Sequence, residues 1–216
     1  KGVNRVSMGV QTFNDDHLSF LHRRHSANQA ISAIKTLRNA GIANISIDLI
    51  YGLPGQSPDL WESDLRQAFA LPVKHLSAYA LSIEEGAPLW QMVRQKKIEE
   101  TDEETERAMY ERLIDTAEAQ GFEHYELSNF TLPGYRSRHN SSYWHDVPYL
   151  GLGPGAHSYD GAARYYNRPD LDAYLAAPGK CLVKENLTEN ERFNDFVFTA
   201  LRTADGLPLD LSLIPL

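Results

Sequence analysis

The densest group of chemically capable side chains lies in one short stretch near residue 140. An imidazole, an amide, a phenol and an indole stand close together there, at His139, Asn140, Tyr143 and Trp144. A glycine-rich segment, residues 149–158 (YLGLGPGAHS), follows directly. Cores favour aliphatic side chains, and glycine weakens a helix or strand that it interrupts. The stretch is therefore a candidate for stacking on and ligating a flat aromatic ligand, and a purely structural His139 is the alternative.

Three polar residues earlier in the chain are further candidates. Asp48 stands in an apolar run, residues 45–51 (ISIDLIY), where a carboxylate needs a partner because burying a lone charge is costly. It either accepts hydrogen bonds from ligand hydroxyls or an amine, or forms an ion pair. Gln11 ends a similar apolar run, and Arg23 in the basic segment 21–25 (LHRRH) equally fits a solvated face.

The sequence supports neither a dinucleotide-binding loop nor a zinc site. Residues 151–156 (GLGPGA) have the glycine spacing of a dinucleotide-binding loop, but Pro154 interrupts it and no amphipathic helix follows. The eight histidines include no HxxxH or HExxH pair, so zinc-site spacing is absent. The sequence assigns no catalytic residue and no metal ligand.

Strand and helix patterns alternate over residues 1–130 and must position these side chains. Period-two or apolar runs predict strands over residues 5–13, 45–51, 75–82 and 123–130. Helices are predicted after a capping box at Ser26 and Gln29, after Ser57 with Pro58 at the first position, and after the cap in residues 101–104. Such repetition with short connections indicates βα units and a parallel sheet, either open or closed into a barrel.

Ligands of such sheets collect at the carboxyl ends of the strands. Gln11, Asp48 and Ser82 lie near predicted strand ends, so we expect Gln11 and Asp48 to face one shared cavity. Past residue 130 the chain becomes rich in Pro, Gly and Tyr, and a helix capped at Thr188 follows. This change predicts a switch of domain between residues 130 and 165.

Composition narrows the class of protein. The chain has 216 residues and a net charge of −8, which argues against a nucleic-acid or anionic-membrane surface. No apolar run approaches the roughly 20 residues of a transmembrane helix. The single cysteine, Cys181, suits a reducing compartment, so a cytoplasmic location is expected.

Four strings carry a resemblance to a known family. They occur in order over nearly the whole chain: residues 7–13 (SMGVQTF), 48–56 (DLIYGLPGQ), 125–130 (YELSNF) and 149–158 (YLGLGPGAHS). Together they resemble the radical S-adenosylmethionine proteins related to oxygen-independent coproporphyrinogen III oxidase. Within that group, residues 139–144 (HNSSYW) look like the HNxxYW signature of the heme-chaperone branch, which the oxidase proper does not carry.

The resemblance implies a fold and cofactors. It implies the second half of a partial (β/α)6 barrel over residues 1–130, then the junction and start of a smaller α+β C-terminal domain over 131–216. It also implies a 4Fe–4S cluster and S-adenosylmethionine, with Gln11, Arg23 and Asp48 on family positions that contact S-adenosylmethionine. Heme would be held by His139, Asn140, Tyr143 and Trp144.

The chain departs from the family in one respect. It contains no CxxxCxxC motif for the cluster, and Cys181 lies far downstream of where the family has it. We therefore expect the chain to be part of a longer protein whose cluster cysteines lie upstream. The expected function is a heme chaperone that passes heme to an acceptor protein. The alternative is an oxidase that decarboxylates the propionates of coproporphyrinogen III.

Overall fold

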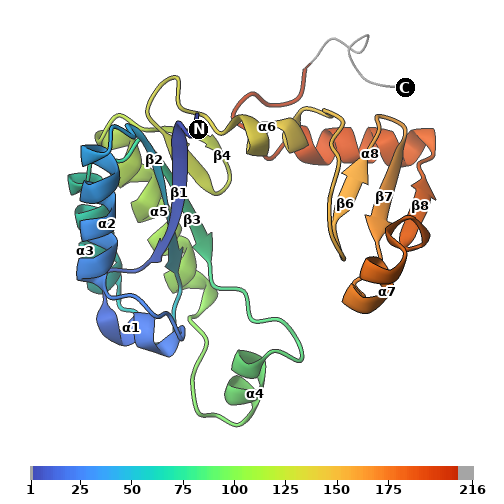
Figure 1. The fold of residues 1–216 in the computed structure, drawn as a ribbon. Helices are drawn as coiled ribbons and strands as arrows, with labels where there is room; N and C mark the ends of the chain where they lie inside the picture. The colour runs from blue at the N-terminus through green and yellow to red at the C-terminus, as the bar shows by residue number, and fades with distance from the viewer. Residues whose placement is uncertain (1, 209–216) are drawn as a thin grey trace. The chain divides into compact units, whose positions relative to one another are not determined.

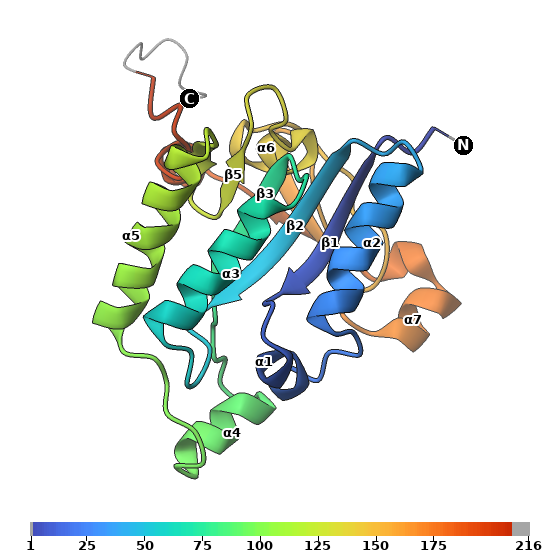
Figure 2. The ribbon, with the colours of Figure 1, turned by 90° about the vertical axis from the view of Figure 1, so that its left-hand side faces the viewer.

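A five-stranded sheet with the strand order β1-β2-β3-β5-β4 forms the centre of the first unit, residues 1–136. The computed structural model describes residues 2–208, and a second unit begins at residue 137. Strands β1 (Arg5–Gln11), β2 (Asn44–Tyr51) and β3 (His75–Ala80) run parallel. Helices α2, α3 and α5 cover one face of the sheet (Figures 1 and 2). Parallel strands joined through helices on one face confirm the predicted βα units.

Each of the three helices that cover the sheet begins directly after a capping residue that the sequence predicts. At the start of α2 (Ala27–Asn39) the Ser26 hydroxyl accepts from the backbone N–H of Gln29, and the Gln29 side chain accepts from the backbone N–H of Ser26. These bonds satisfy donors that a helix start leaves without partners. The other two covering helices are α3 (Pro58–Ala70), which Ser57 caps, and α5 (Glu103–Ala119), which Asp102 caps.

Alternation along the strands separates an apolar face from a polar one. Ile45, Ile47 and Leu49 of β2 are fully buried and belong to the same core as Ile34 of α2 and Leu65 of α3. Successive side chains of a strand point to opposite faces. The intervening residues of β2, Ser46 and Asp48 among them, therefore point to the face that these helices do not cover.

The strand predicted over residues 123–130 is wrong in one respect: it is two strands. β4 (Glu123–Glu126) and β5 (Asn129–Thr131) form an antiparallel hairpin, and β5 also pairs antiparallel with β3. The turn between them lacks Gly or Pro, so the alternating pattern conceals it, and the Asn129 amide donates to the Glu126 carboxylate across it. Two short helices of the first unit were not predicted, α1 (Asp15–Phe20) and α4 (Pro88–Arg94).

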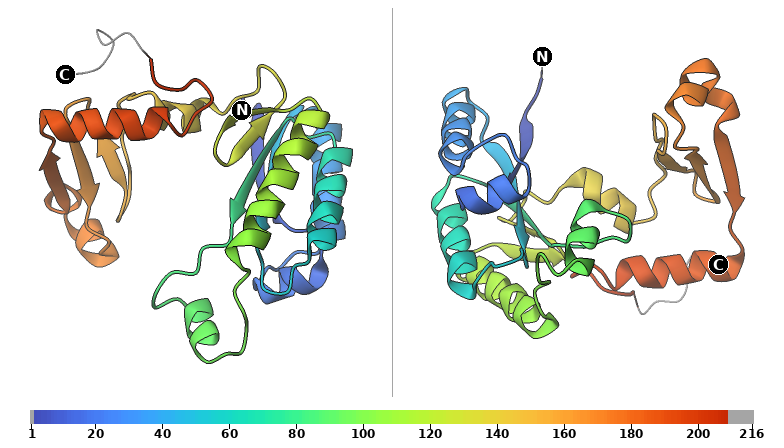
Figure 3. Two further views of the ribbon diagram at one scale, coloured as in Figure 1. Left: turned by 180° about the vertical axis from the view of Figure 1, so that it is seen from behind. Right: turned by 90° about the horizontal axis from the view of Figure 1, so that it is seen from below.

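The second unit contains a three-stranded antiparallel sheet in the order β6-β7-β8. Helix α8 (Glu189–Ala200) runs across the strands of this sheet (Figure 3) and starts at the predicted capping box of Thr188 and Glu191. Among the residues described, no helix has the length and apolar character that crossing a membrane requires. The remaining elements are α6 (Arg138–Trp144), β6 (His157–Tyr159), β7 (Ala163–Asn167), α7 (Leu171–Ala176), the 3-10 turn η1 (Pro178–Lys180) and β8 (Leu182–Asn186).

Candidate functional site

The uncovered face of the first sheet carries a row of polar groups around Asp48. In the parallel register Asp48 stands between Gly9 of β1 and Ser77 of β3. The Ser7 hydroxyl donates to its Oδ1 at 3.3 Å. Burial raises the pKa of Asp48, while hydrogen bonds from Ser77 and Ser7 and the charge of Arg5 act in the opposite direction. The carboxylate is therefore a half-buried acceptor held between small hydroxyl donors.

The side chain of Gln11 joins Asp48 on this face. A Cβ atom added to Gly9 would lie 2.4 Å from Nε2 of Gln11, so the amide lies directly over that glycine. Because Gly9 is the register partner of Asp48, side chains at the two positions point to the same side of the sheet. Gln11 and Asp48 therefore lie on one face, as the shared-cavity hypothesis requires.

Asp48 lies near the carboxyl end of its strand, as expected, but it does not end the strand. β2 continues for three residues beyond it, to Tyr51. The turn residues that mark the end of the strand, Gly52 to Gly55, come later in the chain. Ser82 follows the end of β3 at Ala80, as predicted.

Arg23 is the third predicted contact for S-adenosylmethionine, and its position differs from the other two. It is exposed in the connection between α1 and α2, where its backbone N–H donates to the carbonyl of Leu18 at 2.9 Å. Its neighbour His25 places Nε2 3.2 Å from the carbonyl oxygen of Val10, next to Gln11. The segment therefore contacts the end of β1, but no contact joins Arg23 itself to Gln11 or Asp48 among the described residues.

A buried carboxylate behind the polar face was not predicted as a site residue. Asp64 is only 3% exposed and lies on the inner side of α3 with Trp61 and Leu65. It accepts from the Thr12 hydroxyl at 2.7 Å and from the backbone N–H of Phe13 at 2.8 Å. The signal in the sequence is a carboxylate inside an apolar helical stripe, which needs partners when buried.

In the second unit, α6 carries the residues expected to bind heme. The Ser137 hydroxyl caps this helix by accepting from the backbone N–H of Asn140 at 3.3 Å. His139 and Tyr143 are one turn apart, with 3.1 Å between Nε2 and the phenol oxygen. Their rings meet edge to face at a centroid distance of 5.1 Å. The imidazole is exposed, so a ligand can reach it from solvent.

Trp144 does not lie beside His139. The Arg202 guanidinium stands 5.1 Å from the centroid of its ring, and the buried indole Nε1 has no hydrogen-bond partner within residues 2–208. Successive residues of a helix are about 100° apart, which places Trp144 about 140° around α6 from His139. The structure thus brings His139 and Tyr143 together and directs Trp144 elsewhere.

Tyr149 extends the aromatic pair and was missing from the predicted set. Its ring lies 4.8 Å from that of Tyr143, edge to face, and its backbone pairs with Tyr159 of β6. The three rings of His139, Tyr143 and Tyr149 form a continuous series. The signal in the sequence is the tyrosine that opens the glycine-rich segment.

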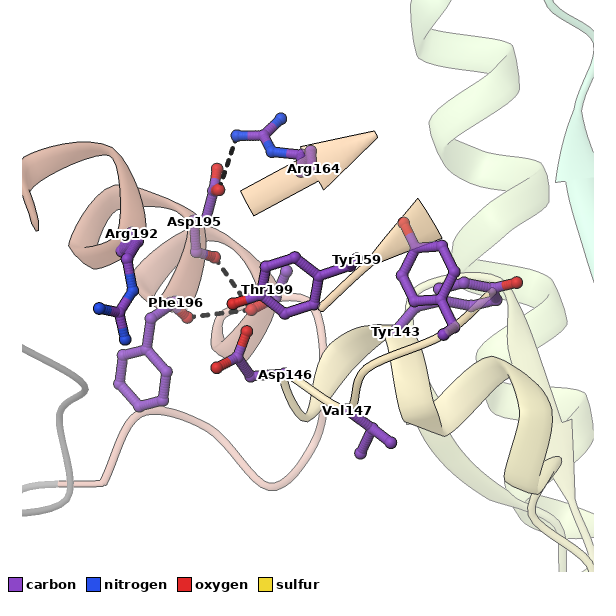
Figure 4. A pocket seen from close by; sticks show the side chains of 10 residues that line it. Tyr143, Asp146, Val147, Tyr159, Arg164, Arg192, Asp195, Phe196 and Thr199 are labelled. Carbon is purple, nitrogen blue, oxygen red and sulfur yellow. Dashed lines mark hydrogen bonds and ion pairs between the residues drawn. The ribbon is translucent and has the colours of Figure 1, made fainter. Parts of the chain in front are cut away.

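A cavity of about 200 Å³ adjoins this series, between α8 and the small sheet (Figure 4). Tyr143, Tyr149 and Tyr159 line it together with ionic side chains, and Arg164 pairs with Asp195 at 2.7 Å. Burial and a hydrogen bond with Asp146 raise the pKa of Tyr159 to about 12. Pockets that enclose a drug-sized ligand measure about 300–1,000 Å³. The cavity is therefore too small to enclose a porphyrin, which would have to lie against the exposed rings.

The glycines of residues 151–155 have structural reasons for their positions. A Cβ atom at Gly151 would lie 2.0 Å from the carbonyl oxygen of His157, so the loop backbone runs directly against β6. Gly153 and Gly155 have φ angles of 113° and 72°, which favour glycine. On the sheet face opposite α8, this loop, α7 and Leu182 enclose a second cavity, of about 450 Å³, which Tyr165 and Tyr174 also line.

Comparisons with known proteins show which families the chain is similar to. Residues 1–68 match the radical SAM superfamily. The chain is 37% identical over 207 residues to the heme chaperone HemW of Lactococcus lactis and 34% identical over 215 residues to that of Bacillus subtilis. Each alignment covers 95% of this chain and 55% of the relative, so the chain spans about half the length of these curated relatives.

The comparison with solved structures supports the fold. The coproporphyrinogen III oxidase HemN of Escherichia coli, described as a radical SAM enzyme, superposes with a TM-score of 0.75 at 22% identity. The match covers 94% of this chain and 50% of that one, and it confirms the predicted partial radical SAM barrel with a following domain. The chain belongs to the radical SAM superfamily, and within it resembles the HemW proteins.

Proposed function

We propose that this chain is part of a heme chaperone that binds heme at His139 and S-adenosylmethionine at the polar face of its first sheet. The observation that carries the proposal is the exposed His139–Tyr143 pair on α6, in a chain that is 37% identical to a protein named heme chaperone. An acceptor protein for the heme and a cytoplasmic location belong to the same proposal.

The polar face suits the hydroxyl and amino groups of S-adenosylmethionine. Asp48 offers an ionisable acceptor, and the Gln11 amide can both donate and accept. Arg23 is the proposed partner for a carboxylate, because its guanidinium is exposed and permanently charged. When bound, a 4Fe–4S cluster and S-adenosylmethionine would supply radical chemistry. The chain has one cysteine, Cys181, so we propose that the cluster thiolates lie outside it.

The proposed binding of heme depends on His139. Histidine is a common axial ligand of heme iron, and the exposed imidazole can approach a metal without moving the core. Tyr143 would orient the ring through its hydroxyl and offer its own ring to the macrocycle. Such outer partners fix the tautomer and direction of a ligating imidazole. Asn140 and Trp144 are proposed as supports of α6 around this ligand.

The alternative is decarboxylation of coproporphyrinogen III, and the likeness to HemN supports only the fold for it. The sequence favours the chaperone, because relatives of that name match 95% of the chain. The two functions differ in what they do with a porphyrin: a chaperone binds the iron complex, and an oxidase consumes the iron-free substrate.

Heme titration of the full-length protein tests the proposal. We expect the wild type to develop a heme absorption band that saturates, and His139→Ala to lose it without a change in melting temperature. His145→Ala is the matched control, because His145 is also exposed next to α6 but pairs with Asp205 at 3.5 Å. A His139→Ala protein that binds heme like the wild type would refute the ligand assignment. Turnover of coproporphyrinogen III by the reconstituted protein would favour the oxidase.

A further inference from the structure

Gln11 has a backbone conformation that few residues adopt. Its φ angle is 71°, and the N–H of Thr12 donates to the carbonyl of Val10 at 3.0 Å. A hydrogen bond that spans one residue of positive φ defines the rarer, strained form of the γ-turn. Strained residues persist where their surroundings hold them, and they are frequent at functional sites. The question is what holds this turn.

Asp64 contacts the turn directly from α3. Its two oxygens accept from the Thr12 hydroxyl at 2.7 Å and the Phe13 N–H at 2.8 Å, the two residues that follow Gln11. Thr12 is fully buried and Asp64 is 3% exposed, so water cannot replace these bonds. The Gln56 amide adds a third donor at 3.4 Å and connects the loop after β2 to the same carboxylate.

The carboxylate is suited to this task by its chemistry. Thr12, Phe13 and Gln56 all present donors, and an ionised carboxylate offers only acceptors. An asparagine in its place would direct an NH2 group toward one of these donors. Burial raises the pKa of Asp64, whereas the hydrogen bonds from Phe13, Thr12 and Gln56 and the charge of His17 lower it. The surroundings therefore offset part of the cost of burying the charge.

The turn determines where the Gln11 amide lies. It bends the chain at the end of β1, at a shift in the β1–β2 register between Gly9 and Gln11. The side chain then lies over Gly9, which has no Cβ to obstruct it. Without the turn, strand alternation would still place Gln11 on the face of Gly9, but its side chain would stand out from the strand and its amide would not fold back over Gly9.

We propose that Asp64 is a positioning residue for the S-adenosylmethionine site, which holds the γ-turn at Gln11 so that the Gln11 amide lies beside Asp48. The inference rests on the proposed binding of S-adenosylmethionine by Gln11. Asp64 itself does not touch the ligand, because it lies buried behind the turn.

Binding of S-adenosylmethionine to the full-length, cluster-reconstituted protein tests the coupling. Asp64→Asn should raise the Kd about tenfold, a typical coupling within one hydrogen-bond network. Glu62→Gln is the control, since Glu62 is an exposed carboxylate on the same helix, and it should leave the Kd unchanged. In a Gln11→Ala background, Asp64→Asn should weaken binding further by no more than about twofold.

Hydrogen exchange in the absence of S-adenosylmethionine tests the turn itself. Amides of residues 11–14 should exchange faster in Asp64→Asn than in the wild type or Glu62→Gln. Gly9→Ala is a second variant that leaves Asp64 intact. Its Cβ should displace the amide of Gln11 and raise the Kd, but residues 12 and 13 should keep their protection.

Three results would overturn the proposal. Unchanged affinity and unchanged exchange in Asp64→Asn would show that the carboxylate does not hold the turn. If Asp64→Asn lowers the affinity for S-adenosylmethionine equally in the wild type and in Gln11→Ala, Asp64 does not act through Gln11. If Asp64→Asn unfolds, wild-type affinity in Gly9→Ala would refute the placement of the amide. If the wild type itself does not bind S-adenosylmethionine, the proposed function fails, and hydrogen exchange alone decides whether Asp64 holds the turn.

Discussion

The Nε2 atom of His139 and the phenol oxygen of Tyr143 lie 3.1 Å apart, one turn from each other on α6. The contact fixes the direction of an otherwise exposed imidazole. The Tyr143 ring also touches Tyr149 at a centroid distance of 4.8 Å. The phenol thus links the proposed iron ligand to the ordered loop beyond the helix.

Removing the Tyr143 hydroxyl should weaken heme binding without abolishing it. Tyr143→Phe keeps both ring contacts but loses the hydrogen bond that orients His139. Loss of such an outer partner typically lowers metal affinity about 10–100-fold. Titration should give a weaker Kd for Tyr143→Phe and a still weaker one for Tyr143→Ala, which also loses the stacking surface. If Tyr143→Phe and the wild type bind heme equally, the hydroxyl has no part in orienting the imidazole.

Replacing Asp48 by Asn should raise stability while lowering the affinity for S-adenosylmethionine. Burial raises the pKa of Asp48 above its usual value, so the charged form is less favourable in the folded protein than in water. The folded state therefore carries a penalty at neutral pH, which disappears as pH falls through the folded pKa and the group protonates.

The measurement is a pair of melting curves at two pH values. Asp48→Asn should melt above the wild type at pH 7, and the difference should shrink near pH 3. Ser77→Ala is the control, because it removes a hydrogen-bond donor to Asp48 and should lower the melting temperature instead. A lower melting temperature for Asp48→Asn at pH 7 would mean that the hydrogen bonds of the carboxylate outweigh its burial.

A buried histidine in the same sheet should contribute to acid sensitivity. His75 is 1% exposed and bonds to Ser46 through Nδ1 and to Tyr125 through Nε2, each at 2.7 Å. Burial, with a smaller contribution from the charge of Arg5, lowers the pKa of His75 to about 3. In the unfolded chain the His75 imidazole takes up a proton near pH 6.5, whereas in the folded protein it stays neutral until about pH 3. The free energy of unfolding should therefore fall as the pH drops from about 6.5 toward 3.

The slope for one such group approaches about 1.4 kcal/mol per pH unit inside that window. Urea unfolding between pH 7 and 4 measures this slope. His75→Gln should make the free energy of unfolding depend less on pH, by up to the slope that one such group contributes. His22→Gln is the control, since His22 is exposed and should leave the slope unchanged. Equal slopes for His75→Gln and the wild type would contradict a neutral, buried imidazole.

Local patterns of the sequence predicted the three parallel strands and the three covering helices of the first unit, because capping residues and apolar periodicity act within a few residues. The capping box at Ser26 and the alternation around Asp48 needed no knowledge of distant contacts. The placement of Gln11 could not be predicted in this way. It depends on a γ-turn held by Asp64, more than fifty residues along the chain.

The heme stretch shows a second cause of failure. The sequence pattern of residues 138–144 does not predict the short helix α6 that they form. On a helix, spacing decides which groups meet, so His139 contacts Tyr143 while Trp144 faces Arg202. The motif alone gave the residues without their directions.

Gly151 should be necessary for the glycine-rich loop to pack closely against β6. A Cβ at Gly151 would lie 2.0 Å from the backbone oxygen of His157, closer than any real contact. Because a strand backbone cannot move away as a flexible side chain can, Gly151→Ala should destabilise the second unit by about 1–3 kcal/mol. Gly179→Ala is the matched control, since a Cβ there meets nothing within 4 Å and its φ is not positive. Urea unfolding followed by tyrosine fluorescence would compare the two. If both variants unfold like the wild type, β6 and the loop do not pack as closely as the structure shows, and the position of Tyr149 beside Tyr143 would lose its support.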